Sequence, residues 1–386
     1  GDEAGGGGGG GAGGGGGFAI PARQPGYSPL GTGMGGPIDE RLARRLNRRW
    51  VQKFAPDPGA TDYVPQVGDR VVYFRRGHRQ YAETYPDLRA PAARRPPWKT
   101  PDGGGGGGGK GGGGGGDGGG GGCPDALECR VACVDYEFPL TQGDPFPEAW
   151  VYMSVHLVPE GGAGVPPFSA LYRPSDAPEF LVLRHRLRAA AEEGWKAGDP
   201  LVMRFGDGQY YGGTVQSFQA DRRSKMPSWD GVAVRWDDGE VTQVNAWEIE
   251  RPKRSSSKKK KKRAGGGPSS SAAARPPALD EGICQQVLLA FNKVCETDAF
   301  RPFMESVTDR VAPGYSLVVP CPMYFNLVRR RLQNGYYRQI EAVYSDIDLI
   351  YKDCREYNNP SSSIVKMAKK ATTSAIQMIE DLYRKK

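Results

Sequence analysis

The sequence predicts a multidomain protein in which an all-β region with an SH3-like barrel precedes an all-α four-helix bundle. Short strand-like runs with tight turns fill residues 62–252, and helical periodicity repeats through residues 279–386. Two blocks, 1–36 and 101–122, contain long runs of glycine, which has no side chain to bury and much backbone entropy to lose on folding. We therefore expect disordered Gly-rich segments before and inside the β region, and a flexible basic linker over 253–278.

A short amphipathic helix is predicted within residues 37–61. Pro37 stands near its first turn, and the acidic Asp39 and Glu40 lie at its positive end. The other face is strongly basic, and docking on the next domain is favoured over direct binding to DNA. Apolar residues recur every fourth position at Ile38, Leu42, Leu46, Trp50 and Phe54.

The β region contains a weak internal sequence repeat, which we call the internal echo. "VGDRVVYF" at 67–74 and "AGDPLVMRF" at 197–205 both place Gly-Asp before a strand-like run, which indicates two related modules. In the second half, the runs LVMRF, YYGGTVQSF, GVAVRW and EVTQV predict a compact meander, with a tight hairpin at "DDG" (237–239). In the first half, LECRVACV and WVYMSVHLV predict strands, and "FLVLRHRLRAAAEEGW" turns from strand into helix.

The helical region contains three long apolar stripes, from Ile283 to Val294, from Ile340 to Cys354 and from Ile364 to Leu382. A shorter helix, "YFNLVRRRLQNG", ends at Asn334-Gly335, a typical helix C-cap. The connection over 301–322 is too long for a simple bundle turn, and long ordered loops in compact domains are usually functional.

Composition limits the classes of function that this chain is expected to have. The formal net charge of +8 and pI near 9.0 favour polyanionic partners. The seven cysteines include no CxxC pair and the three histidines are scattered, so we expect no metal site and reduced thiols in an intracellular protein. No catalytic motif, cofactor motif or membrane-spanning run is visible, and the start "GDEAGG" lacks Met, as expected of a fragment. We therefore expect no catalytic residues, no cofactor and no membrane partner.

The linker carries a dense basic run. It is predicted to act as a nuclear import signal, a nucleic-acid tether or both, and each role indicates the nucleus. Its residues are Lys258, Lys259, Lys260, Lys261, Lys262 and Arg263.

The helical region contains the motifs "RPF" (301–303), "PGYSLVV", "RRRLQNGYY" and "EYNNPSSSIV". Through these motifs, residues 279–386 resemble a bromodomain, and the resemblance implies a left-handed four-helix bundle that binds acetyl-lysine. The resemblance implies that Asn358 holds the acetyl carbonyl, that Tyr315 reaches it through water and that Ile364 is the gatekeeper. Arg301 stands where the family usually has a tryptophan. The implied acetyl-lysine-binding residues are Asn358, Tyr357, Tyr315, Ile364, Val307, Phe303 and Pro302.

The β region, followed by this bundle, resembles the Tudor-like segment of bromodomain and WD-repeat proteins, with the WD repeats absent. Tudor modules hold methylated lysine in an aromatic cage. Because adjacent strand residues face opposite ways, Tyr210 and Tyr211 cannot both line one cage. Phe205 and Trp236 have core packing as an alternative role, and Trp247 is expected to pack. The cage candidates are Phe205, Tyr211, Trp236 and Asp238.

These features predict a nuclear chromatin reader active in transcription regulation. Its expected partners are acetylated and methylated histone tails, with nucleosomal DNA held by the basic segments. Weak affinities of the two modules would combine through the linker by effective concentration. The alternative is a basic, nucleic-acid-binding chromatin scaffold with degenerate pockets, whose binding would depend steeply on salt.

Overall fold

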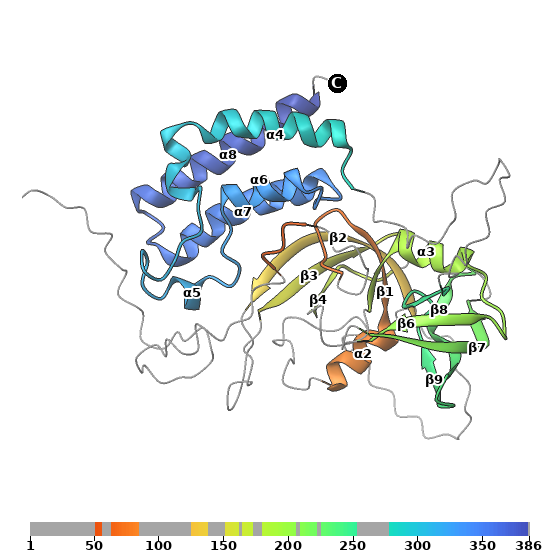
Figure 1. The fold of residues 1–386 in the computed structure, drawn as a ribbon. Coiled ribbons are helices and arrows are strands. Elements are labelled where there is room, and N and C mark those ends of the chain that lie inside the picture. The colour runs from red at the N-terminus through yellow and green to blue at the C-terminus, as the bar shows by residue number, and fades with distance from the viewer. Residues whose placement is uncertain are drawn as a thin grey trace, which may run out of the picture.

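The computed structural model describes a β region followed by a helical region (Figure 1). A short segment at 51–55 precedes them. The described residues are 51–55, 63–84, 125–137, 151–161, 164–172, 180–205, 209–221, 225–252 and 278–384.

The first β module is a five-stranded antiparallel sheet with the strand order β4-β3-β2-β1-β5. Its last strand pairs with its first, Val72 lying opposite Val182. A register shift follows Val131 where β2 pairs with β3. The strands are β1 (Arg70–Phe74), β2 (Ala126–Glu137), β3 (Tyr152–Pro159), β4 (Phe168–Tyr172) and β5 (Leu181–Leu183).

The second β module repeats this arrangement. Its strand order, β10-β6-β7-β8-β9, is the same order read from the other edge. The internal echo in the sequence therefore marks two sheets of one topology. The described pairings leave each sheet open, so the SH3-like barrel stays a prediction. The strands are β6 (Pro200–Arg204), β7 (Tyr210–Ala220), β8 (Pro227–Trp236), β9 (Val241–Val244) and β10 (Ile249–Glu250).

Two helices connect strands of the β region, and α3 also connects the two modules. Helix α3 (Arg184–Glu192) continues from β5, as its sequence predicts. Helix α2 (Arg75–Thr84) follows β1, and its sequence has no apolar stripe that would predict a helix. Trp247 is buried and stacks on Phe74 with ring centroids 4.8 Å apart, so the expected packing role of Trp247 is confirmed.

The helical region contains the four expected helices, α4 (Glu281–Cys295), α6 (Phe325–Gln333), α7 (Ile340–Tyr357) and α8 (Ser363–Arg384). Asp280 caps α4 by accepting a hydrogen bond from the amide of Ile283. Gly335 takes a φ of +63° just past α6, the left-handed conformation that the Asn-Gly stop predicts. The long connection forms two short helices, η2 (Asp298–Phe303) and α5 (Tyr315–Val318).

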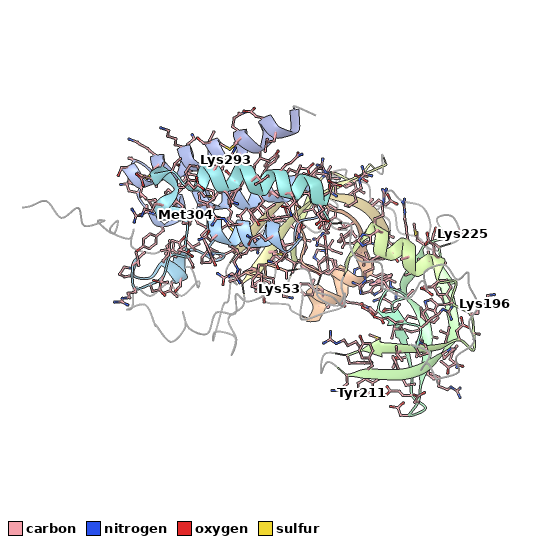
Figure 2. All side chains as sticks on the ribbon, turned by 45° about the horizontal axis from the view of Figure 1, so that its top comes forward. Lys53, Lys196, Tyr211, Lys225, Lys293 and Met304 are labelled. Carbon is pink, nitrogen blue, oxygen red and sulfur yellow. The ribbon has the colours of Figure 1, made fainter. Side chains whose placement is uncertain are left out.

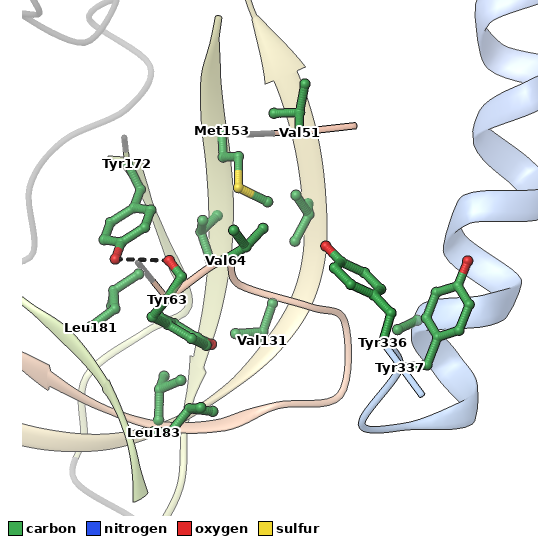
Figure 3. Close-up of a cluster of buried hydrophobic side chains, with 14 of the residues drawn as sticks. Val51, Tyr63, Val64, Val131, Met153, Tyr172, Leu181, Leu183, Tyr336 and Tyr337 are labelled. Atoms are coloured by element: carbon green, nitrogen blue, oxygen red, sulfur yellow. Dashed lines mark hydrogen bonds between the residues drawn. The ribbon is translucent and has the colours of Figure 1, made fainter. Parts of the chain in front are cut away.

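One cluster of buried side chains runs through both regions. Figure 3 shows Tyr336, from the turn after α6, lying between the helical region and the strands that carry Val131 and Met153. Val51 is fully buried in this cluster, and residues 51–55 form a turn. Most of the helix predicted within 37–61 lies outside the described residues, and its described end, 51–55, is not helical but packs on the folded body through Val51.

The six described cysteines are free thiols, four buried and two half-buried. No helix in the described part of the chain is long and apolar enough to cross a membrane. Among the same residues, no cluster of His, Cys, Asp and Glu is arranged to hold a metal ion.

Candidate functional site

The first candidate site lies at the C-terminal end of α7. Asn358 caps this helix with extended backbone, because the residues before Pro360 leave the α region. Its side-chain nitrogen donates a 2.8 Å hydrogen bond to the Cys354 carbonyl and lies 3.6 Å from the Cys354 sulfur. Asn359 is exposed, and its side-chain oxygen accepts a hydrogen bond from the Ser361 amide. The two asparagines therefore differ in role: Asn359 shapes the turn, as expected.

Two tyrosines meet beside this helix end. The ring of Tyr315, in α5, lies edge-on to the ring of Tyr357, with centroids 5.1 Å apart. The Tyr357 hydroxyl donates a 3.0 Å hydrogen bond to the Pro313 carbonyl. Tyr315 is buried and Tyr357 is half-buried. The long connection is thus held against the residue that precedes Asn358.

Further side-chain contacts order the long connection. Ser316 gives its amide and its hydroxyl to the Asp309 carboxylate at 2.9 and 2.5 Å. At the far end, the Met323 amide donates a 2.8 Å hydrogen bond to Asp353, a buried carboxylate on α7. These contacts explain why a connection of this length is ordered.

The other predicted pocket residues lie on the elements around the connection. Phe303 is buried at the end of η2, next to the exposed Pro302. Val307 follows η2 and Ile364 begins α8, and both are half-buried. Arg301 is exposed in η2. Among the predicted site residues, Tyr315 and Tyr357 are therefore in direct contact. Tyr357 also bonds to the loop that leads into α5.

The thiol of Cys354 lies beside the Asn358 amide and is part of the local electrostatics. Burial raises the pKa of Cys354 to about 11, although its hydrogen bond with Asn358 acts in the opposite direction. Burial likewise raises the pKa of the Tyr357 phenol. Both groups are neutral at physiological pH, so they present no negative charge that would attract an unmodified lysine.

The family comparison covers this helical region. Residues 284–370 match the family model described as Bromodomain. The C-terminal region is a bromodomain. The β region lies outside this match, and its resemblance to the Tudor-like segment of bromodomain and WD-repeat proteins stays a prediction.

Curated relatives match short parts of this chain. "Bromodomain adjacent to zinc finger domain protein 2A" of Xenopus laevis is 33% identical over 92 residues, which are 24% of this chain and 5% of that protein. "Bromodomain-containing protein 7" of Gallus gallus is 32% identical over 77 residues, 20% of this chain and 12% of that protein. "Chromatin structure-remodeling complex subunit snf21" of Schizosaccharomyces pombe is 27% identical over 104 residues, 26% of this chain and 9% of that protein. The matched segments thus span small parts of these relatives.

A second candidate site lies at one end of the second β module. The Phe205 ring meets the rings of Tyr211 and Trp236 at centroid distances of 5.0 and 5.4 Å, both steeply inclined. The Trp236 indole is fixed by a 2.7 Å hydrogen bond to the Thr242 hydroxyl. Phe205 is 41% exposed and Tyr211 is 47% exposed. Figure 2 shows Tyr211 at the opposite end of the molecule from Met304 of the bromodomain.

Two adjacent aspartates, Asp237 and Asp238, follow Trp236, and the cage role of Asp238 stays a prediction. The Asp238 carboxylate accepts a 3.0 Å hydrogen bond from the Glu240 amide and so serves the β8–β9 turn. The Asp237 carboxylate lies over Gly212, on the face of β7 opposite the Tyr211 side chain.

Among the described residues, the equivalent end of the first β module has no such cluster. Phe205, Tyr211 and Trp236 correspond by strand register to Arg75, Leu127 and Pro159. None of these three residues is aromatic. The aromatic cluster is therefore a property of the second module and does not follow from the shared fold.

The predicted nuclear import run, Lys258 to Arg263, lies outside the described residues.

Proposed function

We propose that this chain is a chromatin-associated reader whose bromodomain binds acetyl-lysine. Acetylation removes the lysine charge and leaves an amide on an aliphatic stem, so its reader needs an apolar slot and a donor for the carbonyl. The observation that carries the proposal is the placement of Asn358 at the end of α7, beside the tyrosine pair and a neutral thiol.

The Asn358 amide has a donor suited to this role. One of its two N–H groups is engaged by the Cys354 carbonyl at 2.8 Å, and the other contact is the 3.6 Å approach to sulfur. Sulfur is a weak acceptor, so a ligand carbonyl would replace it at little cost. A neutral hydrogen bond contributes only ~1 kcal/mol net, so a single acetyl-lysine is expected to bind weakly.

The two neighbouring asparagines provide the test. Asn358→Ala should lower the affinity for a diacetylated histone H4 tail peptide by roughly 10-fold or more, because it removes the donor and leaves the carbonyl unpaired. Asn359→Ala is the matched control: it loses one exposed contact to Ser361 and should leave the affinity within a few-fold. Both variants would be titrated calorimetrically, with circular dichroism to confirm folding.

The possible outcomes separate three cases. Equal losses for the two variants, or no loss for Asn358→Ala, would refute the acetyl-lysine assignment. If the wild type also fails to bind, the first residue to replace is Arg301, which stands at the position of the family's usual tryptophan, and the variant to test is Arg301→Trp. Binding that depends steeply on salt and ignores acetylation would favour the nucleic-acid scaffold.

A second function, binding of methylated lysine, is proposed for the aromatic cluster of the second module. Three rings inclined to one another can surround a methylammonium group, and each cation–π contact contributes ~0.5–2 kcal/mol. The carboxylate of Asp238, in the β8–β9 turn, adds negative charge near this end of the sheet. Its presence favours a cationic ligand over a neutral one.

The neighbouring tyrosines of β7 test this second function. Tyr211→Ala should abolish binding of a trimethyl-lysine histone peptide, because Tyr211 contacts Phe205. Tyr210→Ala should not, because adjacent strand residues face opposite sides of a sheet. A modified-histone peptide array on both variants would show the difference. Loss of binding in Tyr210→Ala but not in Tyr211→Ala would exclude the proposed cage. Equal binding by both variants would exclude any cage that uses Tyr211.

A further inference from the structure

Each β module begins with the same hydrogen-bonded corner. Gly68 and Gly198 both have a φ of +91°, which only glycine adopts easily. The Gly68 amide donates to the Val131 carbonyl and the Val131 amide donates to the Asp69 carbonyl, at 2.8 and 2.9 Å. Gly198, Val215 and Asp199 repeat these two bonds at the same distances. Asp69 and Asp199 therefore occupy equivalent positions, which we call the aspartate corners.

Both aspartate corners bind an arginine. In the second module, Arg251 follows β10 and places a guanidinium nitrogen 3.2 Å from the Asp199 carboxylate. The same guanidinium lies over the ring of Trp195, 4.5 Å from its centroid. This module thus supplies its own arginine.

The first module receives its arginine from the bromodomain. Arg338 donates two hydrogen bonds to Asp69, from Nε to Oδ1 at 2.8 Å and from Nη2 to Oδ2 at 2.7 Å. Its guanidinium lies 5.3 Å from the ring centroid of Tyr63. Arg338 thus reproduces, from 269 residues away, the contacts that Arg251 makes inside its own module.

The two corners differ in burial. The side chains of Arg338 and Asp69 are 11% and 2% exposed, against 39% and 29% for Arg251 and Asp199. A buried, bidentate pair is strongly destabilised when one partner is removed, because the other charge is left uncompensated. The corner that involves the bromodomain is therefore the more tightly engaged of the two.

Neighbouring residues extend this contact. The Gln66 side chain donates to the Tyr336 carbonyl at 2.9 Å and accepts from the Arg338 amide at 3.0 Å, so it binds the bromodomain backbone on both sides. Gly68 approaches so closely that a Cβ there would meet the Gln339 side chain at 3.0 Å. Beside Gly68, Arg130 pairs with Glu341 at 2.9 Å.

We propose that the bromodomain turn 336–338 is a docking element that fills the aspartate corner of the first β module and joins the two regions into one rigid reader. Bivalent binding, which rests on the function proposed above, is then set by a fixed separation of the two candidate sites. The length of the 253–278 connection does not set it. This replaces the expectation that a flexible linker combines the two affinities.

The test combines a linker extension with a matched pair of arginine variants. About 20 Gly and Ser residues are inserted within 253–278 of the full chain. Energy transfer is measured between dyes carried by unnatural amino acids at two exposed positions, Gln243 on β9 and Lys369 on α8. In the wild type and in Arg251→Gln the insertion should leave the transfer efficiency unchanged. In Arg338→Gln it should lower the efficiency, because the regions then separate.

Thermal unfolding provides the second measurement. Arg338→Gln should lower the midpoint by on the order of 10 °C, and Arg251→Gln by no more than ~3 °C. Gln66→Ala, which leaves no charge buried, is the milder variant if Arg338→Gln does not fold, and it should also make the energy transfer depend on linker length. Energy transfer that falls on insertion in the wild type would overturn the proposal, as would identical behaviour of Arg338→Gln and Arg251→Gln.

A binding measurement connects docking to function. The probe is a peptide that carries both an acetyl-lysine and a trimethyl-lysine. The wild type should bind it with the same affinity before and after the insertion, whereas the docking variants should bind it more weakly after the insertion. If this peptide does not bind the wild type, the proposed function fails while energy transfer and unfolding still decide whether the regions dock.

Discussion

The ring of Tyr357 stands edge-on to that of Tyr315, and its hydroxyl donates a hydrogen bond to the Pro313 carbonyl. The first contact joins α7 to α5, and the second joins α7 to the loop that leads into α5. The wall of the candidate acetyl-lysine site is thus positioned by a tyrosine that immediately precedes the asparagine expected to bind the ligand.

We predict that Tyr357→Phe weakens binding of the acetylated peptide by about five-fold. The phenylalanine ring keeps the contact with Tyr315 but loses the 3.0 Å hydrogen bond to Pro313, which is worth ~1 kcal/mol. Calorimetric titration would measure the change. An affinity equal to that of the wild type would show that the Pro313 contact does not position the site.

Stability should fall in acid because of His78. Its ring stacks on Phe180 and lies 3.0 Å from the Tyr73 hydroxyl, and burial lowers its pKa from 6.5 to about 3. The folded state therefore favours the neutral ring. This contribution is complete above the unfolded pKa of 6.5 and is lost as pH falls toward 3, at up to ~1.4 kcal/mol per pH unit.

His78→Phe removes the titrating group and keeps a ring against Phe180. The variant should lose less stability than the wild type between neutral and mildly acidic pH, although it starts lower because Tyr73 loses a partner. Urea unfolding at several pH values would compare the two slopes. Parallel slopes would assign the acid sensitivity to other groups.

We predict that replacing Gly77 in α2 by alanine destabilises the fold. A Cβ at this position would overlap the Trp229 indole, whose Cζ2 and Cζ3 atoms would lie 2.7 Å away, too close for any real contact. Trp229, on β8 of the second module, is buried against α2, so it cannot move aside cheaply. Gly77→Ala should therefore lower the free energy of unfolding by ~1–3 kcal/mol.

Gly282, in the first turn of α4, provides the control for that substitution. A Cβ there meets only the Asp280 carboxylate, at 3.1 Å, and alanine favours helix. Gly282→Ala should change stability little or raise it. A loss equal to that of Gly77→Ala in chemical unfolding would contradict the role assigned to Trp229.

The basic run at 258–263 is predicted to direct the chain to the nucleus. Replacing its lysines and arginine with serine should shift a fluorescently tagged chain toward the cytoplasm and lower its non-specific affinity for DNA. Microscopy and binding at several salt concentrations would test both effects. Unchanged localisation together with an unchanged salt slope would remove the assignment.

The sequence alone was sufficient for features that depend on neighbouring residues. Apolar periodicity located α4, α6, α7 and α8, and Asn334-Gly335 located the end of α6. The shared Gly-Asp motif was enough to suggest two related modules, because the corner it forms needs a left-handed glycine in each. Strand alternation placed Tyr211, and not Tyr210, on the face of Phe205.

Other features depended on contacts that the sequence does not encode locally. Helix α2 has no apolar stripe because it packs through a few aromatic contacts, among them the approach of Gly77 to Trp229. Asp237 and Asp238 are adjacent and chemically alike, and only the path of the β8–β9 turn decides which carboxylate lies beside Gly212.

Local sequence determined most elements of this protein, with α2 an exception, because helix periodicity, strand alternation and turn chemistry act over a few residues. Tertiary structure alone decided how the elements meet. Arg338 and Arg251 are both ordinary basic residues in the sequence, and 269 residues separate Arg338 from Asp69. The buried pairing of Arg338 with Asp69 arises only when both folded regions present complementary charge and shape at one place, which no local pattern can specify.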